Sequence, residues 1–358
     1  MGTEDFTAGE VAAMDEALDL AARGVRGANP LVGAVILDAD GATLGTGYHR
    51  GAGTAHAEAD ALANARTARA DVRGATMVVT LEPCSHTGRT GPCTRAIIDA
   101  GLARVVFAVG DATEEAAGGA AALRAAGVEV ASGLAAGPAA ELNARWTAAT
   151  AERRPFITVK LAQSLDGRIA AADGTSQWIT GPKARQDGRR LRSRVDAILA
   201  GTGTVLADNP RLTARDAGGT EAQRQPLRVV VGRRPVPADA AVRGTDGRFL
   251  QLPTHDPAEV CAELYGRGVR HLLLEGGATL AGAFLRAGLA DELVVYTAPL
   301  LLGAGTGSVT GIGVNTLADA SRWRWDHAAG GAVTIIGPDL RLRLEPEPPS
   351  TQDDSKDA

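Results

Sequence analysis

Four features are scarce in this sequence: cysteines, long apolar runs, net positive charge and aromatic side chains. The scarcity of each argues against one class of protein. It contains 3 cysteines in 358 residues, too few for a disulfide scaffold, so a reducing cytoplasm is the expected compartment. We find no apolar run of the roughly 18 residues that a transmembrane helix needs. The first 30 residues carry acids where a secretory signal needs a basic end, so we expect no signal peptide.

Positive charge and aromatic side chains are the other two shortages. The formal net charge is −5, and aromatic residues make up 3% of the chain. A nucleic-acid-binding surface needs a basic field or aromatic stacking platforms, and an anionic membrane attracts the same basic field. The composition therefore favours a small-molecule substrate over nucleic-acid and membrane partners.

The length predicts two domains, because 358 residues are many for a single hydrophobic core. A charged stretch that ends in proline, AERRP at 151–155, follows a predicted helix and marks the junction. We therefore expect one domain over 1–150 and a second over 151–345. Residues 346–358 are acidic and proline-rich, which predicts a disordered tail.

Both domains alternate short apolar runs with helical patterns, which is typical of α/β layer folds. In the first domain the patterns predict strands at 32–37, 77–81, 105–109 and 128–131, and helices near 10–21, 57–68, 93–101 and 114–126, the last ended by Gly127. In the second they predict strands at 156–161, 197–199, 228–231, 271–274 and 293–297, and helices at 182–194 and 278–287.

The strongest chemical pattern is a histidine followed by two cysteines. His56 and Glu58 open a helical pattern, and Cys84 and Cys93 follow in the chain, where we expect both sulfurs near helix starts that favour thiolate. Zn²⁺ binds such donors, and three protein ligands leave the fourth tetrahedral position for water, as in a catalytic site. Glu58 lies two positions past His56, about 200° round a helix, so we expect an acid/base beside that water rather than a ligand.

This pattern suits the hydrolytic removal of an amino group from a heteroaromatic ring, because zinc lowers the pKa of water and a carboxylate carries its proton to the departing nitrogen. A closed structural zinc site is one alternative; it needs His49 or His86 as fourth ligand and leaves Glu58 without a role. Two buried thiols without metal are another. Cys261 has no His or Cys near it in the sequence and is predicted to be a core thiol.

The order His-x-Glu, Pro-Cys, Cys resembles the zinc nucleobase deaminases. Most of them have two residues between the cysteines, whereas this chain has eight. The long gap, filled by SHTGRTGP, and the upstream NPLVG at 29–33 closely resemble the bacterial bifunctional riboflavin-biosynthesis deaminase/reductase family. Ala55 departs from that family, which usually has proline there. The resemblance implies a cytidine-deaminase-like domain with zinc on His56, Cys84 and Cys93, Glu58 as acid/base, and a substrate pocket lined by Asn29, His49 and His86.

The second domain carries weaker signals of its own. Glu275-Gly276-Gly277 joins a predicted strand to a predicted helix and could turn backbone amides toward a phosphate, although a tight turn without ligand is the commoner explanation. No G-x-G-x-x-G motif opens a Rossmann domain. Three segments, RPFITVKLAQSLDGRIA, TVLADNPRLTAR and LLLEGGATLAGAFL, resemble the reductase half of the same family, whose fold is like dihydrofolate reductase.

That resemblance implies a homo-oligomer whose second domain uses NADPH to reduce the ribosyl group of the deaminated product to ribityl. Arg192 and Arg215 match the family's substrate-phosphate positions, although an arginine run such as 185–194 is most often a solvated helix face. The other implied substrate residues are Ser176, Leu212 and Glu275. The implied NADPH residues are Ala162, Trp178, Thr204, Asp208, Gly277, Ala278, Thr279, Leu280, Ala281, Gly282 and Ala283, with Asp208 as an orienting group.

Three other functions remain open at this point. The second domain could hold substrate without reducing it, and the first could act on tRNA, although the eight-residue cysteine gap and the reductase-like half argue against the latter. A non-enzymatic nucleotide- or RNA-binding protein with a structural zinc is the third, and the acidic balance counts against it.

Overall fold

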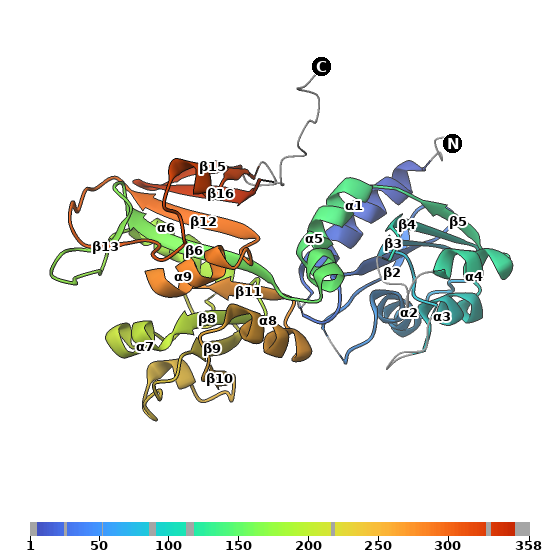
Figure 1. The fold of residues 1–358 in the computed structure, drawn as a ribbon. Helices are drawn as coiled ribbons and strands as arrows, with labels where there is room; N and C mark the ends of the chain where they lie inside the picture. Colours follow the sequence, from blue (N-terminus) through green and yellow to red (C-terminus); the bar gives the residue numbers. More distant parts are fainter. Residues whose placement is uncertain are drawn as a thin grey trace, which may run out of the picture. The chain divides into compact units, whose positions relative to one another are not determined.

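The computed structural model describes residues 6–24, 27–51, 53–85, 91–111, 118–215, 219–326 and 331–347. The chain divides into two compact units, residues 1–153 and 154–358, both built from strands and helices, so the predicted α/β class is confirmed (Figure 1). Of the predicted tail, Pro346 ends the last strand, Glu347 follows it, and the rest lies outside the described residues. Among the helices of the described part, none combines the length and the hydropathy needed to traverse a bilayer.

The first unit is a mixed sheet in the order β2-β1-β3-β4-β5. β1 pairs antiparallel with both β2 and β3, whereas β3, β4 and β5 are parallel. Its elements are α1 (Ala8–Ala22), β1 (Gly33–Leu37), β2 (Thr43–Tyr48), α2 (Ala57–Thr67), β3 (Thr76–Leu81), α3 (Cys93–Ala100), β4 (Arg104–Val109), α4 (Gly119–Ala125), β5 (Glu129–Ser132) and α5 (Ala136–Glu152).

Helices cover both faces of this sheet, which gives three layers (Figure 1). Met14 of α1 and Ala139 of α5 pack with Val78 on one face. α2, α3 and α4 pack on the other face, where Ile97 joins a cluster with Met77. The inner strands β1, β3 and β4 therefore bury side chains on both sides, which explains why they read as continuous apolar runs.

α2 lies very close to β2, and this contact sets the position of the helix that carries Glu58. A Cβ atom added at Gly47 would lie 2.2 Å from the backbone nitrogen of Ala61 and 2.5 Å from the carbonyl oxygen of Ala57. We expect Gly47→Ala to push α2 from the sheet and to lower the free energy of unfolding by about 1–3 kcal/mol. Chemical denaturation measures the loss. Gly41→Ala serves as a control for backbone strain, because φ there is +84° and the added atom has no neighbour within 4 Å.

Most predicted elements of the first unit are confirmed to within a few residues. Gly127 has φ +84° and directly follows the C-cap Ala126, as predicted. Of the predicted helix at 114–126, the described part is α4, and residues 112–117 lie outside the description. β2 was missed, because TLGTGY has two glycines and no clear apolar alternation.

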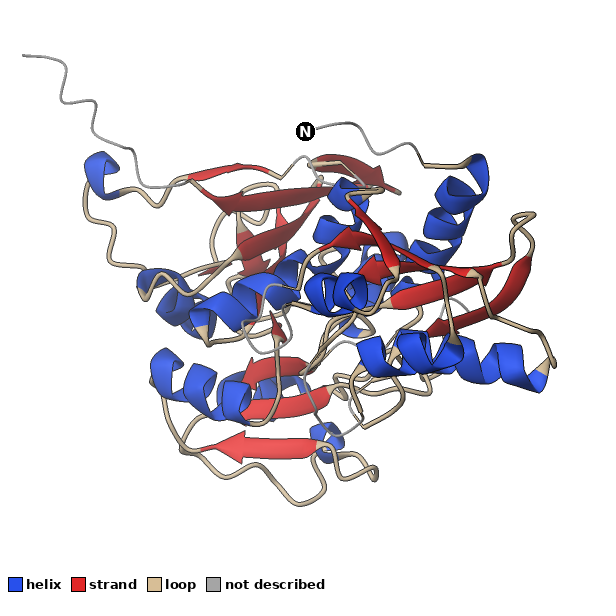
Figure 2. Ribbon diagram, turned by 90° about the vertical axis from the view of Figure 1, so that its right-hand side faces the viewer, coloured by secondary structure: helices blue, strands red, loops and turns tan. Residues whose placement is uncertain are grey.

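The second unit has a larger sheet in the order β10-β9-β8-β11-β6-β12-β16-β14, with β15 also on β16. Figure 2 shows the strands of the chain in red and its helices in blue. The strands from β10 to β12 in this order are parallel, and β16 is antiparallel to β12. The elements are β6 (Phe156–Ser164), β7 (Arg168–Ala170), α6 (Pro182–Arg192), β8 (Ala197–Gly201), α7 (Thr202–Asp208), β9 (Leu227–Val231), β10 (Phe249–Leu252), α8 (Pro257–Gly266), β11 (His271–Leu274), α9 (Ala278–Arg286), β12 (Glu292–Ala298), β13 (Thr306–Gly307), β14 (Trp323–Trp325), β15 (Val333–Ile336) and β16 (Asp339–Pro346), with short 3₁₀ helices at Ala241–Arg243 and Leu317–Asp319.

α8 and α9 cover one face of this sheet, where Leu264 and Phe284 pack with Val159. α6 lies on the other face, with Ala184 against Val294 and Tyr296. Cys261 is buried in the α8 layer, which confirms the prediction of a core thiol, and burial raises its pKa to about 11. The predicted strands and helices of this unit are confirmed, whereas β7, α7, α8, β10 and β13 to β16 were not predicted.

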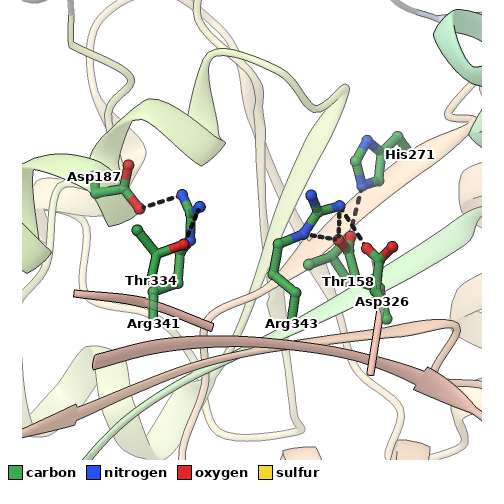
Figure 3. Close-up of polar contacts among 8 residues, drawn as sticks. Thr158, Asp187, His271, Asp326, Thr334, Arg341 and Arg343 are labelled. Atoms are coloured by element: carbon green, nitrogen blue, oxygen red, sulfur yellow. Dashed lines mark hydrogen bonds and ion pairs between the residues drawn. The ribbon is translucent and has the colours of Figure 1, made fainter. Parts of the chain in front are cut away.

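A network of buried polar side chains joins the amino-terminal ends of β6, β11 and β12 to β16 (Figure 3). The Thr158 hydroxyl donates to Glu292 at 2.7 Å, so it accepts from Nε2 of His271 at 2.8 Å. Arg343 of β16 binds Glu292 and Asp326 at 2.9 and 2.8 Å. Ligands of parallel α/β sheets bind at the carboxyl ends of the strands, so we assign this network to holding β16 in register.

Candidate functional site

Three elements of the first unit bring His56, Cys84 and Cys93 together. His56 is the N-cap of α2, Cys84 follows β3, and Cys93 is the first residue of α3. Nδ1 of His56 lies 3.6 Å from Sγ of Cys84 and 3.3 Å from Sγ of Cys93. A tetrahedral zinc with bonds of about 2.1 Å to nitrogen and 2.3 Å to sulfur separates N and S donors by about 3.6 Å. The three donors therefore fit a zinc ion.

The two cysteine side chains are hydrogen-bonded to each other, and this bond shifts their pKa values in opposite directions. A hydrogen bond from the Cys93 thiol, together with His56 and the Cys93 backbone N–H 3.5 Å from Cys84 Sγ, outweighs burial and lowers the pKa of Cys84 to about 4. The same thiol–thiol hydrogen bond, together with burial, raises the pKa of Cys93. The Cys84 sulfur, which accepts from the first N–H of α3, is therefore easily ionised, and thiolate is the form that binds metal.

Glu58 lies in the first turn of α2 with 3% of its surface exposed, and it is not one of the three clustered donors. Its carboxyl group contacts the Cys93 thiol. Burial raises the pKa of Glu58, and the negative charge of Cys84 adds to the effect. A buried carboxyl group beside a metal site is suited to take up and release a proton during a reaction.

His49 lies beside the metal ligands but does not complete the set. Its Nδ1 is 3.0 Å from the carbonyl oxygen of Ala55, and its Nε2 is 3.0 Å from Nδ2 of Asn29. Its ring meets that of His56 edge-on at 5.5 Å. Both ring nitrogens have partners, so within the described residues the donor group stays at three. The predicted pocket residue His86 lies outside the described residues.

In the second unit, the predicted cofactor residues gather where β6, β8 and β11 end. Thr204 in α7 accepts a hydrogen bond at 3.1 Å from the backbone N–H of Gly277, the N-cap of α9. This bond joins the turn after β8 to the turn after β11, and the predicted stretch 277–283 forms the start of α9. Ala162 lies near the end of β6. These are the carboxyl ends of neighbouring parallel strands, where nucleotides bind in α/β sheets.

Five other predicted residues lie at the end of α7 or in loops of the second unit. Trp178 is 64% exposed and stacks with Arg185 at 4.6 Å, and Asp208 is the exposed last residue of α7. Ser176 lies partly buried between β7 and α6. Leu212 is buried with φ +51°. Arg215 donates to the carbonyl oxygen of Gly219 at 2.8 Å.

Glu275, directly after β11, is bound by Arg192 through both carboxylate oxygens, at 2.7 and 2.9 Å. Arg192 also donates to the carbonyl oxygen of Thr213 at 3.2 Å. The Lys160 ammonium lies 3.9 Å from Glu275. Burial alone would raise the pKa of Glu275, but Arg192 and then Lys160 outweigh it and lower the pKa to about 2. The two predicted substrate residues thus form one buried ion pair.

Sequence reasoning missed two basic residues here. Lys160 is a charged residue within the apolar run 156–161, which was the available signal. Arg189 was named only as part of an arginine run. Burial and the positive charges of Arg192, Arg215 and Arg185 lower the pKa of Arg189, so these guanidinium groups lie near one another. Clustered guanidinium groups suit a phosphate monoester.

Both halves of the chain match known families. Residues 9–109 match the cytidine and deoxycytidylate deaminase zinc-binding region, and residues 155–329 match the RibD C-terminal domain. The chain is 46% identical to the riboflavin biosynthesis protein RibD of Mycobacterium tuberculosis over 94% of this chain and 98% of the relative. It is 40% identical to RibD of Escherichia coli over 92% and 98%.

Solved structures agree over nearly the whole chain. Acinetobacter baumannii RibD is 35% identical and superimposes with a TM-score of 0.84, covering 95% of this chain and 99% of that one. A diaminohydroxyphosphoribosylaminopyrimidine deaminase/5-amino-6-(5-phosphoribosylamino)uracil reductase from Thermotoga maritima is 30% identical with the same TM-score and coverage. The zinc donors and Glu58 lie in the half that matches the deaminases, and the Arg192–Glu275 pair lies in the half that matches the reductases. The chain therefore belongs to the RibD family of riboflavin biosynthesis proteins, enzymes that join a zinc-binding deaminase domain to a reductase domain.

Proposed function

We propose that the first unit deaminates 2,5-diamino-6-ribosylamino-4(3H)-pyrimidinone 5′-phosphate, and that the second reduces the ribosyl group of the product with NADPH. The observation that carries the first half is the set of three zinc donors with a buried carboxyl group against one of them. The deaminase and reductase activities in the name of the Thermotoga maritima relative support the choice of substrate. We further propose a cytoplasmic homo-oligomer without nucleic-acid or membrane partners.

In the deaminase half, His56, Cys84 and Cys93 would hold zinc, whose contribution is to lower the pKa of a water molecule. Glu58 would take the proton from this water as it adds to the amino-bearing ring carbon, and would deliver a proton to the leaving nitrogen. The carbon–nitrogen bond breaks, ammonia leaves, and the ring gains a carbonyl group. Asn29, His49 and His86 would bind the substrate.

In the reductase half, the turns after β8 and β11 would hold NADPH with Ala162 and Trp178, and Asp208 would orient it. NADPH would supply a hydride to C1′ of the opened ribose, and a proton from solvent would complete the reduction to ribityl. The chain's own contribution is to align the two reactants: Glu275, Ser176 and Leu212 would line the substrate pocket, and Arg192 and Arg215 would bind its phosphate.

One assay tests both halves. Purified protein is analysed for metal, supplied with the diaminopyrimidinone substrate, and followed for ammonia release and NADPH oxidation separately. We expect bound zinc, ammonia release without NADPH, and NADPH oxidation after deamination. Ammonia release without any NADPH oxidation, even on deaminated substrate, would mean that the second unit binds the substrate but does not reduce it. Bound zinc without ammonia release would contradict the deaminase.

A further inference from the structure

A buried side chain remote from the zinc donors holds the segment that carries Asn29. Asn143 of α5 is 5% exposed. Its Oδ1 accepts from the backbone N–H of Leu31 at 2.8 Å, and its Nδ2 donates to the carbonyl oxygen of the same residue at 2.9 Å. The carboxamide thus pairs with one peptide residue through a donor and an acceptor, which among side chains of this size only asparagine provides.

Further hydrogen bonds hold the same segment on either side of Leu31. Nε1 of Trp146, one turn further along α5, donates to the carbonyl oxygen of Ala28 at 3.1 Å. The backbone N–H of His49 donates to the carbonyl oxygen of Val32 at 2.9 Å. Asn29 therefore lies in a stretch whose backbone is held at Ala28, Leu31 and Val32, so its position depends on α5.

From Asn29 the chain of contacts continues to the zinc site. A carbonyl oxygen only accepts, so Nδ1 of His49 donates to Ala55, and Nε2 of His49 accepts from Nδ2 of Asn29. The Nδ2 end of the Asn29 amide therefore faces His49, and Oδ1 is the end that does not contact His49. Ala55 directly precedes the zinc donor His56, whose ring also contacts His49.

We propose that Asn143 is a positioning residue of the deaminase site, which acts by holding Leu31 so that Asn29 is correctly placed to bind the substrate. The inference rests on the deaminase activity proposed above. It assigns a role in substrate binding to α5, an element that supplies no residue to the zinc site. Asn143 itself is not expected to touch the substrate.

The test is a double-mutant cycle between Asn143 and Asn29 in the full-length enzyme. Asn143→Leu keeps the size of the side chain but removes both hydrogen bonds, and we expect deaminase kcat/KM to fall about 10- to 100-fold, mainly through KM. In an Asn29→Ala background the same substitution is expected to cost less than about 2-fold, because the residue it positions is gone. Zinc content and the reductase rate on deaminated substrate should stay at the wild-type level.

Two further variants separate positioning from stability. Ala139→Gly lowers the Tm by weakening α5 and does not touch the 28–32 segment, so it is expected to leave deaminase KM unchanged. Trp146→Phe removes one hydrogen bond at the helix surface and is expected to raise KM about 3-fold, which keeps the test available if Asn143→Leu does not fold. The proposal is overturned if the losses from Asn143→Leu and Asn29→Ala simply multiply, or if Trp146→Phe leaves KM at the wild-type value. A wild-type enzyme that releases no ammonia would instead refute the deaminase itself.

Discussion

Glu58→Gln is expected to lower the rate of ammonia release by about 10²- to 10⁴-fold, the usual contribution of a positioned general acid/base. Glutamine has the same shape but can neither accept nor release the proton that the reaction moves. Since Glu58 is not one of the clustered donors, the variant should retain zinc and should oxidise NADPH on deaminated substrate at the wild-type rate. Ammonia release, metal content and NADPH oxidation are measured on the same preparation.

The matched control is Asp60→Asn, on the same helix. The Asp60 carboxylate accepts from the Tyr48 backbone N–H and binds Arg50 at 2.6 Å, and it is not one of the clustered donors. We expect this variant to keep ammonia release within a few-fold of wild type. Equal activity in Glu58→Gln and wild type would contradict the acid/base role and would favour a structural zinc.

Glu275→Gln is expected to lower the free energy of unfolding by about 3 kcal/mol, because it leaves Arg192 largely buried without its counter-charge. The side chains of Arg192 and Glu275 are 19% and 10% exposed. NADPH oxidation should also fall, while ammonia release should not. Chemical denaturation gives the free energy, with Glu263→Gln as control, since Glu263 pairs with Arg267 on the surface of α8 and such pairs contribute about 0.5 kcal/mol.

The same ion pair predicts a dependence of stability on pH. The pKa of Glu275 falls from its ordinary value of 4.5 to about 2 in the folded chain. A carboxyl group with a lowered pKa stabilises the fold fully above its unfolded pKa, and that contribution is lost as the pH falls through the folded value. Stability carried by this group should therefore decline between pH 4.5 and about 2, and Glu275→Gln should lack that part of the decline. An identical acid profile in both proteins would contradict the ion pair.

The metal site could be predicted from sequence because its chemistry depends on a few residue types in a fixed order. His56 and Cys93 stand at helix starts and Cys84 follows a strand, and apolar runs identify the strands that bring them together. Asn143 could not be predicted in the same way. Its contact with Leu31 spans 112 residues, and an asparagine within a run of alanines has no local pattern that marks a tertiary role.

The second unit was predictable in its parallel strands and less so elsewhere. Buried strands such as His271–Leu274 read as apolar runs, whereas β14, β15 and β16 are partly exposed, and charged residues interrupt β14 and β16. α8 did carry a signal, Asp256 as N-cap followed by Pro257, which was not used. Lys160 was missed because the sequence does not show which residue a single lysine in an apolar strand will contact. Only the fold places it 3.9 Å from Glu275.

The hold of α5 on the Leu31 backbone sets a limit on how this chain can be divided. Every zinc donor lies before residue 94, so a truncated deaminase ending after β5 would retain the complete metal motif. It would lack both Asn143 and Trp146, and the strand-entering loop at 28–31 would lose its anchors. Any stand-alone version of this half, whether arising by gene fission or by engineering, must therefore extend through Glu152, although its chemistry appears complete some sixty residues earlier.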